Sequence, residues 1–231
     1  NISHSRVVDL GPLSSCPALH HIDASFTHVA DIDALSSCHA LKTLVLTATK
    51  VTNIDKLGAC LSLETLDLAK TLVRTVTALS SCHNLRRLFL SSTPLDTSKP
   101  LPAFHTLRAL DVSDTKVADI TDLSSCTSLA GLCLERTLVV DLNSLYFCRG
   151  LQTLRLTSTQ VADITFVSGC SNLESLNMSG TPLTDITALS TCSRLTNLML
   201  KATNVGDIQA LSACPNLDTL DLSGTQVADI S

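Results

Sequence analysis

Residues 170–191 read CSNLESLNMSGTPLTDITALST, and the spacing of the cysteine and leucines in this stretch decides the fold. The pattern C-x-x-L-x-x-L-x-L-x-x-T-x-V-x-D-I-x-x-L-S-x recurs every 22 residues, and Phe104 fills the one boundary position that lacks a cysteine. A period of this length without insertions predicts a solenoid of stacked units, each contacting its neighbours. The nine boundary cysteines, which we call the grid cysteines, are Cys16, Cys38, Cys60, Cys82, Cys126, Cys148, Cys170, Cys192 and Cys214.

The motif L-x-x-L-x-L-x-x-T-x-V-x-D-I resembles the leucine-rich repeat in its short 22-residue class, which includes the listerial internalins and a regulatory subunit of protein phosphatase. The resemblance covers the whole chain, with Thr in place of the usual Asn and Cys in place of the usual boundary Leu. This Cys/Thr variant is similar in style to leucine-rich-repeat proteins of trypanosomatid parasites.

The resemblance implies an α/β-type repeat solenoid. We expect a curved, right-handed leucine-rich-repeat array, with a parallel sheet of short strands on the concave face and 3₁₀ turns and loops on the convex face. It would form a single domain over residues 1–231, with about ten units. Because Asn1 and Ser231 both fall inside a unit and no polar cap is visible, we expect an excerpt of a longer array.

Local patterns predict the parts of each unit. The L-x-L alternation indicates a short strand with alternate side chains buried, so that Leu132 and Leu134 point inward. The segment D-I-x-x-L-S is too short for an amphipathic helix and predicts one 3₁₀ turn with its Asp as N-cap. A calcium ladder is the alternative for this Asp column. The hydroxyl of the repeated Thr is expected to bond to the backbone of the adjacent turn.

The grid cysteines stand where a buried residue belongs, so we expect small hydrophobic side chains with free thiols pointing inward. A ladder of disulfides is the alternative, although nine cysteines cannot all pair and stacked side chains rarely have the required dihedral angle. Unpaired thiols indicate a reducing compartment, and hence a cytoplasmic protein. In that case the sequons at Asn1 and Asn177 are unused; a cell-surface protein is the alternative.

Several classes of function lack their sequence signals. The net charge of -5 disfavours a nucleic-acid binder, and no apolar run reaches the roughly 18 residues that membrane insertion requires. No glycine-rich phosphate loop, Cys-x-x-Cys or His-Glu-x-x-His motif is present. His83 and His105 fall on adjacent units but have no third ligand in their column. We therefore expect no catalytic residue, metal or cofactor, and no enzyme within these residues.

The candidate site lies where the repeat varies. Three columns around the two strand leucines face outward, and the column between these leucines holds Cys133, the one cysteine off the grid. Small residues at Ala109, Ser113 and Gly131 predict a shallow depression with a charged rim, which is typical of a protein-binding surface. The predicted partner-binding residues are Val45, Arg87, Phe89, Asp111, Cys133, Glu135, Arg155, Asn177 and Met199.

The leading hypothesis is a non-catalytic scaffold that binds a protein partner, of unknown identity, on the concave face. An extracellular adhesin or receptor ectodomain, and a targeting arm of an enzyme encoded outside these residues, are the alternatives. A minor redox hypothesis assigns Arg155 the role of favouring a Cys133 thiolate.

A second candidate surface lies on the expected convex side. Residues 91–107 depart most from the consensus, with Pro100 and Pro102 stiffening the turn. Tyr146, Phe147 and Phe166 gather three aromatic residues in neighbouring turns. Repacking of the core around large residues is the competing interpretation.

Overall fold

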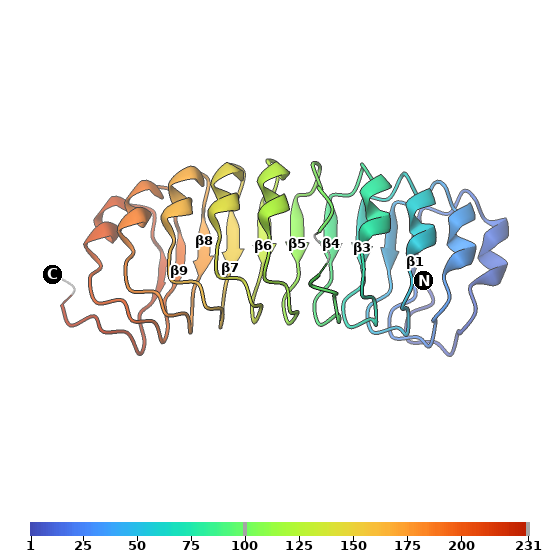
Figure 1. Cartoon of the computed structure of the whole chain (residues 1–231), viewed down its shortest axis with the longest axis horizontal. Coiled ribbons are helices and arrows are strands. Elements are labelled where there is room, and N and C mark those ends of the chain that lie inside the picture. The colour runs from blue at the N-terminus through green and yellow to red at the C-terminus, as the bar shows by residue number, and fades with distance from the viewer. Residues whose placement is uncertain (99–100, 230–231) are drawn as a thin grey trace. The chain divides into compact units, whose positions relative to one another are not determined.

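The structure is a computed structural model in which residues 1–98 and 101–229 are described. Contacts between Cα atoms divide the chain into two compact units, unit 1 over Asn1–Lys116 and unit 2 from Val117 onward. Within each unit a repeat runs through a three-residue strand, a tight turn, an extended stretch and one 3₁₀ turn, which the strands and coiled ribbons of Figure 1 show. The predicted combination of parallel strands and 3₁₀ turns is confirmed.

Over its described residues, 1–98 and 101–116, unit 1 holds five strands that pair in parallel and in sequence order. Residues 22 apart lie side by side, as where Leu44 pairs with both Ile22 and Leu66. The strands are β1 (His21–Asp23), β2 (Thr43–Val45), β3 (Thr65–Asp67), β4 (Arg87–Phe89) and β5 (Ala109–Asp111). The 3₁₀ turns are η1 (Gly11–Ser15), η2 (Asp33–Ser37), η3 (Asp55–Ala59) and η4 (Thr77–Ser81).

Unit 2 repeats the arrangement with the same register. Its strands are β6 (Gly131–Cys133), β7 (Thr153–Arg155), β8 (Ser175–Asn177), β9 (Asn197–Met199) and β10 (Thr219–Asp221). Its turns are η5 (Thr121–Ser125), η6 (Asn143–Phe147), η7 (Thr165–Gly169), η8 (Thr187–Thr191) and η9 (Gln209–Ala213).

The core of each unit is built from the leucine columns. The middle residue of a strand and the residue after the strand point inward, so Leu132 and Leu134 are buried as predicted. Residues on either side of the middle position point away from the core, because successive side chains of a strand alternate. The alternation places every candidate contact residue on the outer face of a strand or next to it.

The repeated Asp stabilises the start of the 3₁₀ turns that it precedes, but from one position earlier than predicted. The N-cap position is occupied by an apolar residue such as Ile120, which makes no side-chain capping bond. Asp119, just before it, accepts a hydrogen bond at Oδ1 from the amide of Thr121 at 2.8 Å, and Asp185 does the same for Thr187. The Asp therefore forms a local turn that satisfies the first amide of the 3₁₀ segment.

The buried Thr column bonds to the backbone as predicted. The Thr159 hydroxyl donates to the Leu156 carbonyl at 2.8 Å, and the other repeats share this contact. The residue before each Thr has a left-handed backbone, at φ 55° for Ala202 and 70° for Gly180. This tight turn directs the chain out of the strand and fixes the exit angle of each repeat.

Eight of the nine grid cysteines are buried, and all ten cysteines are free thiols. The Cys60 thiol donates to the Leu35 carbonyl of the preceding repeat at 3.4 Å, and Cys170 contacts the Leu145 carbonyl likewise. The expectation of burial is wrong for Cys16, which is exposed. A grid cysteine is covered by the repeat before it, and the described residues ahead of Cys16, 1–15, make up less than one 22-residue repeat.

The repeat between β4 and β5 departs from the others. Phe104 is buried in the cysteine position, as the repacking interpretation expects. Residues 101–104 form no 3₁₀ turn, consistent with the missing amide hydrogen of Pro102. Pro100 and Ser231 lie outside the described residues.

Candidate functional site

In unit 1 the outward column alternates acidic and apolar side chains. Phe89 is half-buried and pairs with Asp67 on one side and Asp111 on the other. Asp67, on β3, also pairs with Val45 on β2, the strand on the opposite side of β3 from Phe89. Arg87, which is exposed, donates from Nε to the Thr65 hydroxyl at 3.2 Å. Unit 1 therefore brings four of the predicted residues onto one face: Val45, Arg87, Phe89 and Asp111.

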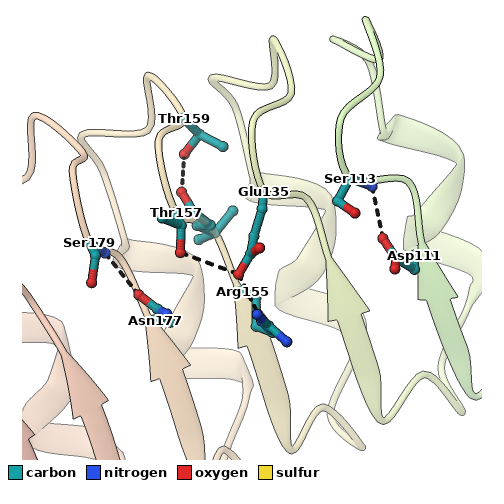
Figure 2. Close-up of polar contacts among 9 residues, drawn as sticks. Asp111, Ser113, Glu135, Arg155, Thr157, Thr159, Asn177 and Ser179 are labelled. Carbon is teal, nitrogen blue, oxygen red and sulfur yellow. Dashed lines mark hydrogen bonds and ion pairs between the residues drawn. The ribbon is translucent and has the colours of Figure 1, made fainter. Parts of the chain in front are cut away.

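The Asp side chains of this column also accept hydrogen bonds from the backbone amide two residues later. Asp111 accepts a hydrogen bond at Oδ1 from the amide of Ser113 at 2.8 Å, and Asp67 accepts one from Ala69 at 2.9 Å. Figure 2 shows the Asp111 bond, and in unit 2 it shows Asn177 accepting from Ser179 in the same way, at 3.0 Å. Asp/Asn side chains at these positions close a turn at the end of the strand. They serve the scaffold even though they face outward.

Two carboxylates of this column have lowered pKa values. The Ser25 hydroxyl, which donates to Oδ1 at 2.6 Å, is the main reason that the pKa of Asp23 is lowered. The Ser223 hydroxyl is the main cause of the lowered pKa of Asp221. These carboxylates stay charged near neutral pH.

In unit 2 the predicted residues surround an ion pair. Arg155 donates from Nε to Glu135 Oε1 at 2.7 Å, and the Thr157 hydroxyl donates to the same oxygen at 3.3 Å (Figure 2). Glu135 is largely buried, whereas the Arg155 side chain is exposed. The partly buried carboxylate fixes the guanidinium on the sheet face, since a charge-assisted bond of this length is a strong one.

Cys133 lies beside this pair. It is half-buried, points outward and pairs with Arg155 in the register of β6 and β7. Because Glu135 already engages the Arg155 guanidinium, less of its positive charge is available to favour a Cys133 thiolate. Asn177 and Met199 continue the row on β8 and β9 and are also half-buried.

The predicted site draws on both units. Arg87 and Asp111 of the expected rim belong to unit 1, while Glu135 and Arg155 belong to unit 2. Sequence reasoning missed the scaffold role of the outward Asp and Asn residues. A signal was present, because Asp or Asn is followed two positions later by a small residue in the pairs 23/25, 67/69, 111/113, 177/179 and 221/223.

The three aromatic residues in the neighbouring turns of unit 2 have two different roles. Phe166 is 3% exposed and belongs to the core, as the repacking interpretation expects. Tyr146 and Phe147 are 46% and 55% exposed, so the core does not require them. They meet edge to face, with ring centroids 5.6 Å apart.

Burial makes at least three of the grid thiols weak acids. Burial raises the pKa of Cys60 and of Cys148 to about 11, and that of Cys170 to about 12. A thiol with such a pKa carries almost no thiolate at neutral pH and is a poor nucleophile. Among residues 1–98 and 101–229, no cluster of three or more His, Cys, Asp or Glu side chains is arranged to hold a metal ion.

The comparisons with known proteins agree with this geometry. The family profile of leucine-rich repeats, in two copies, matches residues 149–191. The chain carries leucine-rich repeats and has the leucine-rich-repeat fold. No curated protein sequence matches it significantly. In the described part of the chain, no helix has the length and apolar character needed to cross a membrane.

Solved structures share the fold at low sequence identity. An internalin, InlF, of Listeria monocytogenes has a TM-score of 0.79 and 23% identity, and the match covers 98% of this chain and 74% of that one. The functional domain of InlJ from the same organism, which includes a cysteine ladder, has a TM-score of 0.85 and 21% identity. That match covers 98% of this chain, which spans about half (49%) of the InlJ chain. A leucine-rich-repeat protein of Leptospira interrogans has a TM-score of 0.79 and 16% identity, covering 98% of this chain and 66% of that one.

Proposed function

We propose that this chain is a non-catalytic scaffold that binds a protein partner through the outward face of its strands. Leucine-rich-repeat proteins generally serve as protein-interaction scaffolds. The observation that carries the proposal is the ion pair of Arg155 with the largely buried Glu135. The ion pair holds a charged side chain in place on the outward face of the strands, and a side chain that is already fixed loses little entropy on binding.

The residues of the outward column are expected to contribute unequally to partner binding. Asp111 and Asn177 bond to their own backbone, so part of their role is structural. Val45, Phe89, Cys133, Arg155 and Met199 have no side-chain carbonyl or carboxylate oxygen and cannot make that bond. They stay on the surface without serving the turn, and we assign the main partner contacts to them.

The test compares binding of variants that keep the turn intact. Phe89→Ser with Arg155→Ser is expected to weaken a peptide or protein selected on the wild-type chain by at least tenfold, as for hot-spot residues. The control, Asp67→Asn with Asp111→Asn, keeps the turn-closing oxygen and is expected to change binding less. Unaltered binding of the first variant would rule out the sheet face.

We also propose that the protein works in a reducing compartment such as the cytoplasm, with a cell-surface location as the alternative. Ten free thiols, eight of them buried, support this proposal. The sequon residue Asn177 lies in a strand and bonds to its own backbone, whereas glycan acceptors usually lie in surface loops. Alkylation of the protein from its source after denaturation without a reductant, followed by mass spectrometry, is expected to label ten cysteines; bridged cysteines or a glycan on Asn177 would contradict the proposal.

A further inference from the structure

The turn η6 has two exposed aromatic residues that the repeat pattern does not require. Tyr146 and Phe147 replace two small residues at the end of the turn, where other repeats have pairs such as Ser124-Ser125 and Ser212-Ala213. The two rings contact each other and remain about half exposed. Leu138 and Val140, on the stretch that leads into η6, are each 58% exposed as well. Single apolar residues are normal on a protein surface, whereas two exposed aromatic rings in contact with each other are not scattered in this way.

Phe147 lines a groove between η5 and η6. The groove has a volume of about 520 Å³, and Asp119 and Asp141 lie in its wall. An equivalent groove of about 560 Å³ lies between η8 and η9, where Asp185, Asp207 and Ala213 occupy the corresponding positions. The groove is therefore a regular product of the repeat, while the aromatic wall is specific to η6. The groove between η8 and η9 therefore shows a similar volume without the aromatic residues.

The groove at η6 has a negative wall. Asp119 and Asp141 are exposed, and no Lys or Arg is among the described residues that line it. Each carboxylate uses Oδ1 to accept the amide of the residue two positions later, at 2.8 and 2.7 Å, so the local turn fixes its position. The hydroxyl and amide of Thr121 hold the pKa of Asp119 below its ordinary value. Asp119 therefore keeps its negative charge at neutral pH.

We propose that the groove between η5 and η6, with Tyr146 and Phe147, is a docking site for a partner-protein segment that places Arg or Lys beside an apolar residue. A guanidinium matches the paired oxygens of a carboxylate and stacks on an aromatic ring, so Asp119, Asp141 and the rings favour the same cation. The adjacent apolar residue of the partner covers Phe147. Aromatic side chains next to fixed charges are typical of binding hot spots.

This surface is separate from the sheet-face proposal. It involves the turns of unit 2, whereas the proposed sheet-face contacts lie on the strands. Either surface can therefore fail without affecting the other.

A display experiment tests the inference with a defined probe. A phage library of random 12-residue peptides is selected in parallel on the whole wild-type chain, on Tyr146→Ser/Phe147→Ser, and on the sheet-face variant Val45→Ser/Phe89→Ser. The first variant restores the Ser-Ser pair of other repeats, and circular dichroism checks its fold. If it does not fold, Phe147→Ala replaces it, since Ala213 occupies that column in η9.

The expected result is a family of peptides with Arg or Lys next to an apolar residue, recovered on wild type and on the sheet-face variant. A synthetic member is expected to bind Tyr146→Ser/Phe147→Ser at least tenfold more weakly and to weaken as salt rises. Equal recovery on that variant, no recovery on wild type, or acidic peptides would overturn the proposal. A dimer in sedimentation that the same variant abolishes would assign the surface to a second copy and also overturn it.

Discussion

Gly169, at the end of η7, gives the sharpest test of how closely the repeats stack. A Cβ atom at this position would lie 2.2 Å from the carbonyl oxygen of Tyr146 and 2.8 Å from its Cδ2. Cβ contacts below 3.0 Å essentially do not occur, so Gly169→Ala has to push η6 and η7 apart by nearly an ångström. The colliding oxygen belongs to the backbone and cannot rotate away, and we expect a cost of about 1–3 kcal/mol in the free energy of unfolding.

Gly131 is the matched control. A Cβ there meets no atom within 4 Å, and neither glycine has a left-handed backbone. Gly131→Ala should stabilise the chain by about 0.4–1 kcal/mol, because alanine restricts the unfolded state. The two variants make the same chemical change, so the difference between them, about 1.4–4 kcal/mol and centred on roughly 2.7 kcal/mol, isolates the collision.

Urea unfolding followed by circular dichroism measures this difference. With a slope of roughly 3 kcal/mol per molar urea, the midpoints of the two variants should differ by nearly 1 M. Equal midpoints, with slopes unchanged, would show that η7 moves without cost. The reasoning that the repeats are tightly stacked at η6 and η7 would then be refuted.

Three further predictions concern the repeat itself. Gly180→Ala places a side chain at a φ of 70° and should lower the free energy of unfolding by about 1 kcal/mol, whereas Gly206→Ala should not; equal urea midpoints would contradict this. The pKa of Asp119 lies below its ordinary value of 3.8, so the stability from its charge is present above that pH and is lost as pH falls through the folded pKa. Asp119→Asn keeps a side-chain oxygen that can accept the amide hydrogen, as Asn53 does before η3, but it removes the titrating carboxyl. The loss of stability at acid pH should therefore become less steep, and an unchanged acid profile would contradict the role given to the Asp119 charge. In thiol titration Cys16 and Cys133 should react quickly and the eight buried cysteines only on unfolding, and fast reaction of all ten would disprove their burial.

The sequence predicts the fold well because packing repeats with the period of the chain. The leucine columns, the Thr hydroxyl bonds and the 3₁₀ turns all depend on contacts inside one repeat or between neighbouring repeats. The same residue types recur every 22 residues, so the same contacts form again in successive repeats. The shift of Asp119 from the N-cap to the preceding position arises from backbone geometry, since Ile120 has to point into the core while the carboxylate reaches the amide of Thr121.

The candidate site is less predictable for a physical reason. Alternation showed which side chains face outward, but it did not show which of them bond to their own backbone, as Asp111 does. The ion pair of Arg155 with Glu135 joins two repeats, but the other repeats do not have Arg and Glu at these two positions. The repeat pattern therefore cannot predict it. Tyr146 and Phe147 stood out in the sequence, yet only their exposure separates them from the buried Phe166.

The backbone bonds of the outward Asp and Asn residues limit how this face can change over time. Asp23, Asp67, Asp111, Asn177 and Asp221 each close a turn, so replacing one of them by an apolar contact residue removes a hydrogen bond worth about 1 kcal/mol. Each gain in contact area at such a position weakens the array that presents it. A surface of this kind can acquire new specificity most readily at the positions that lack the bond, beginning with Val45, Phe89 and Met199.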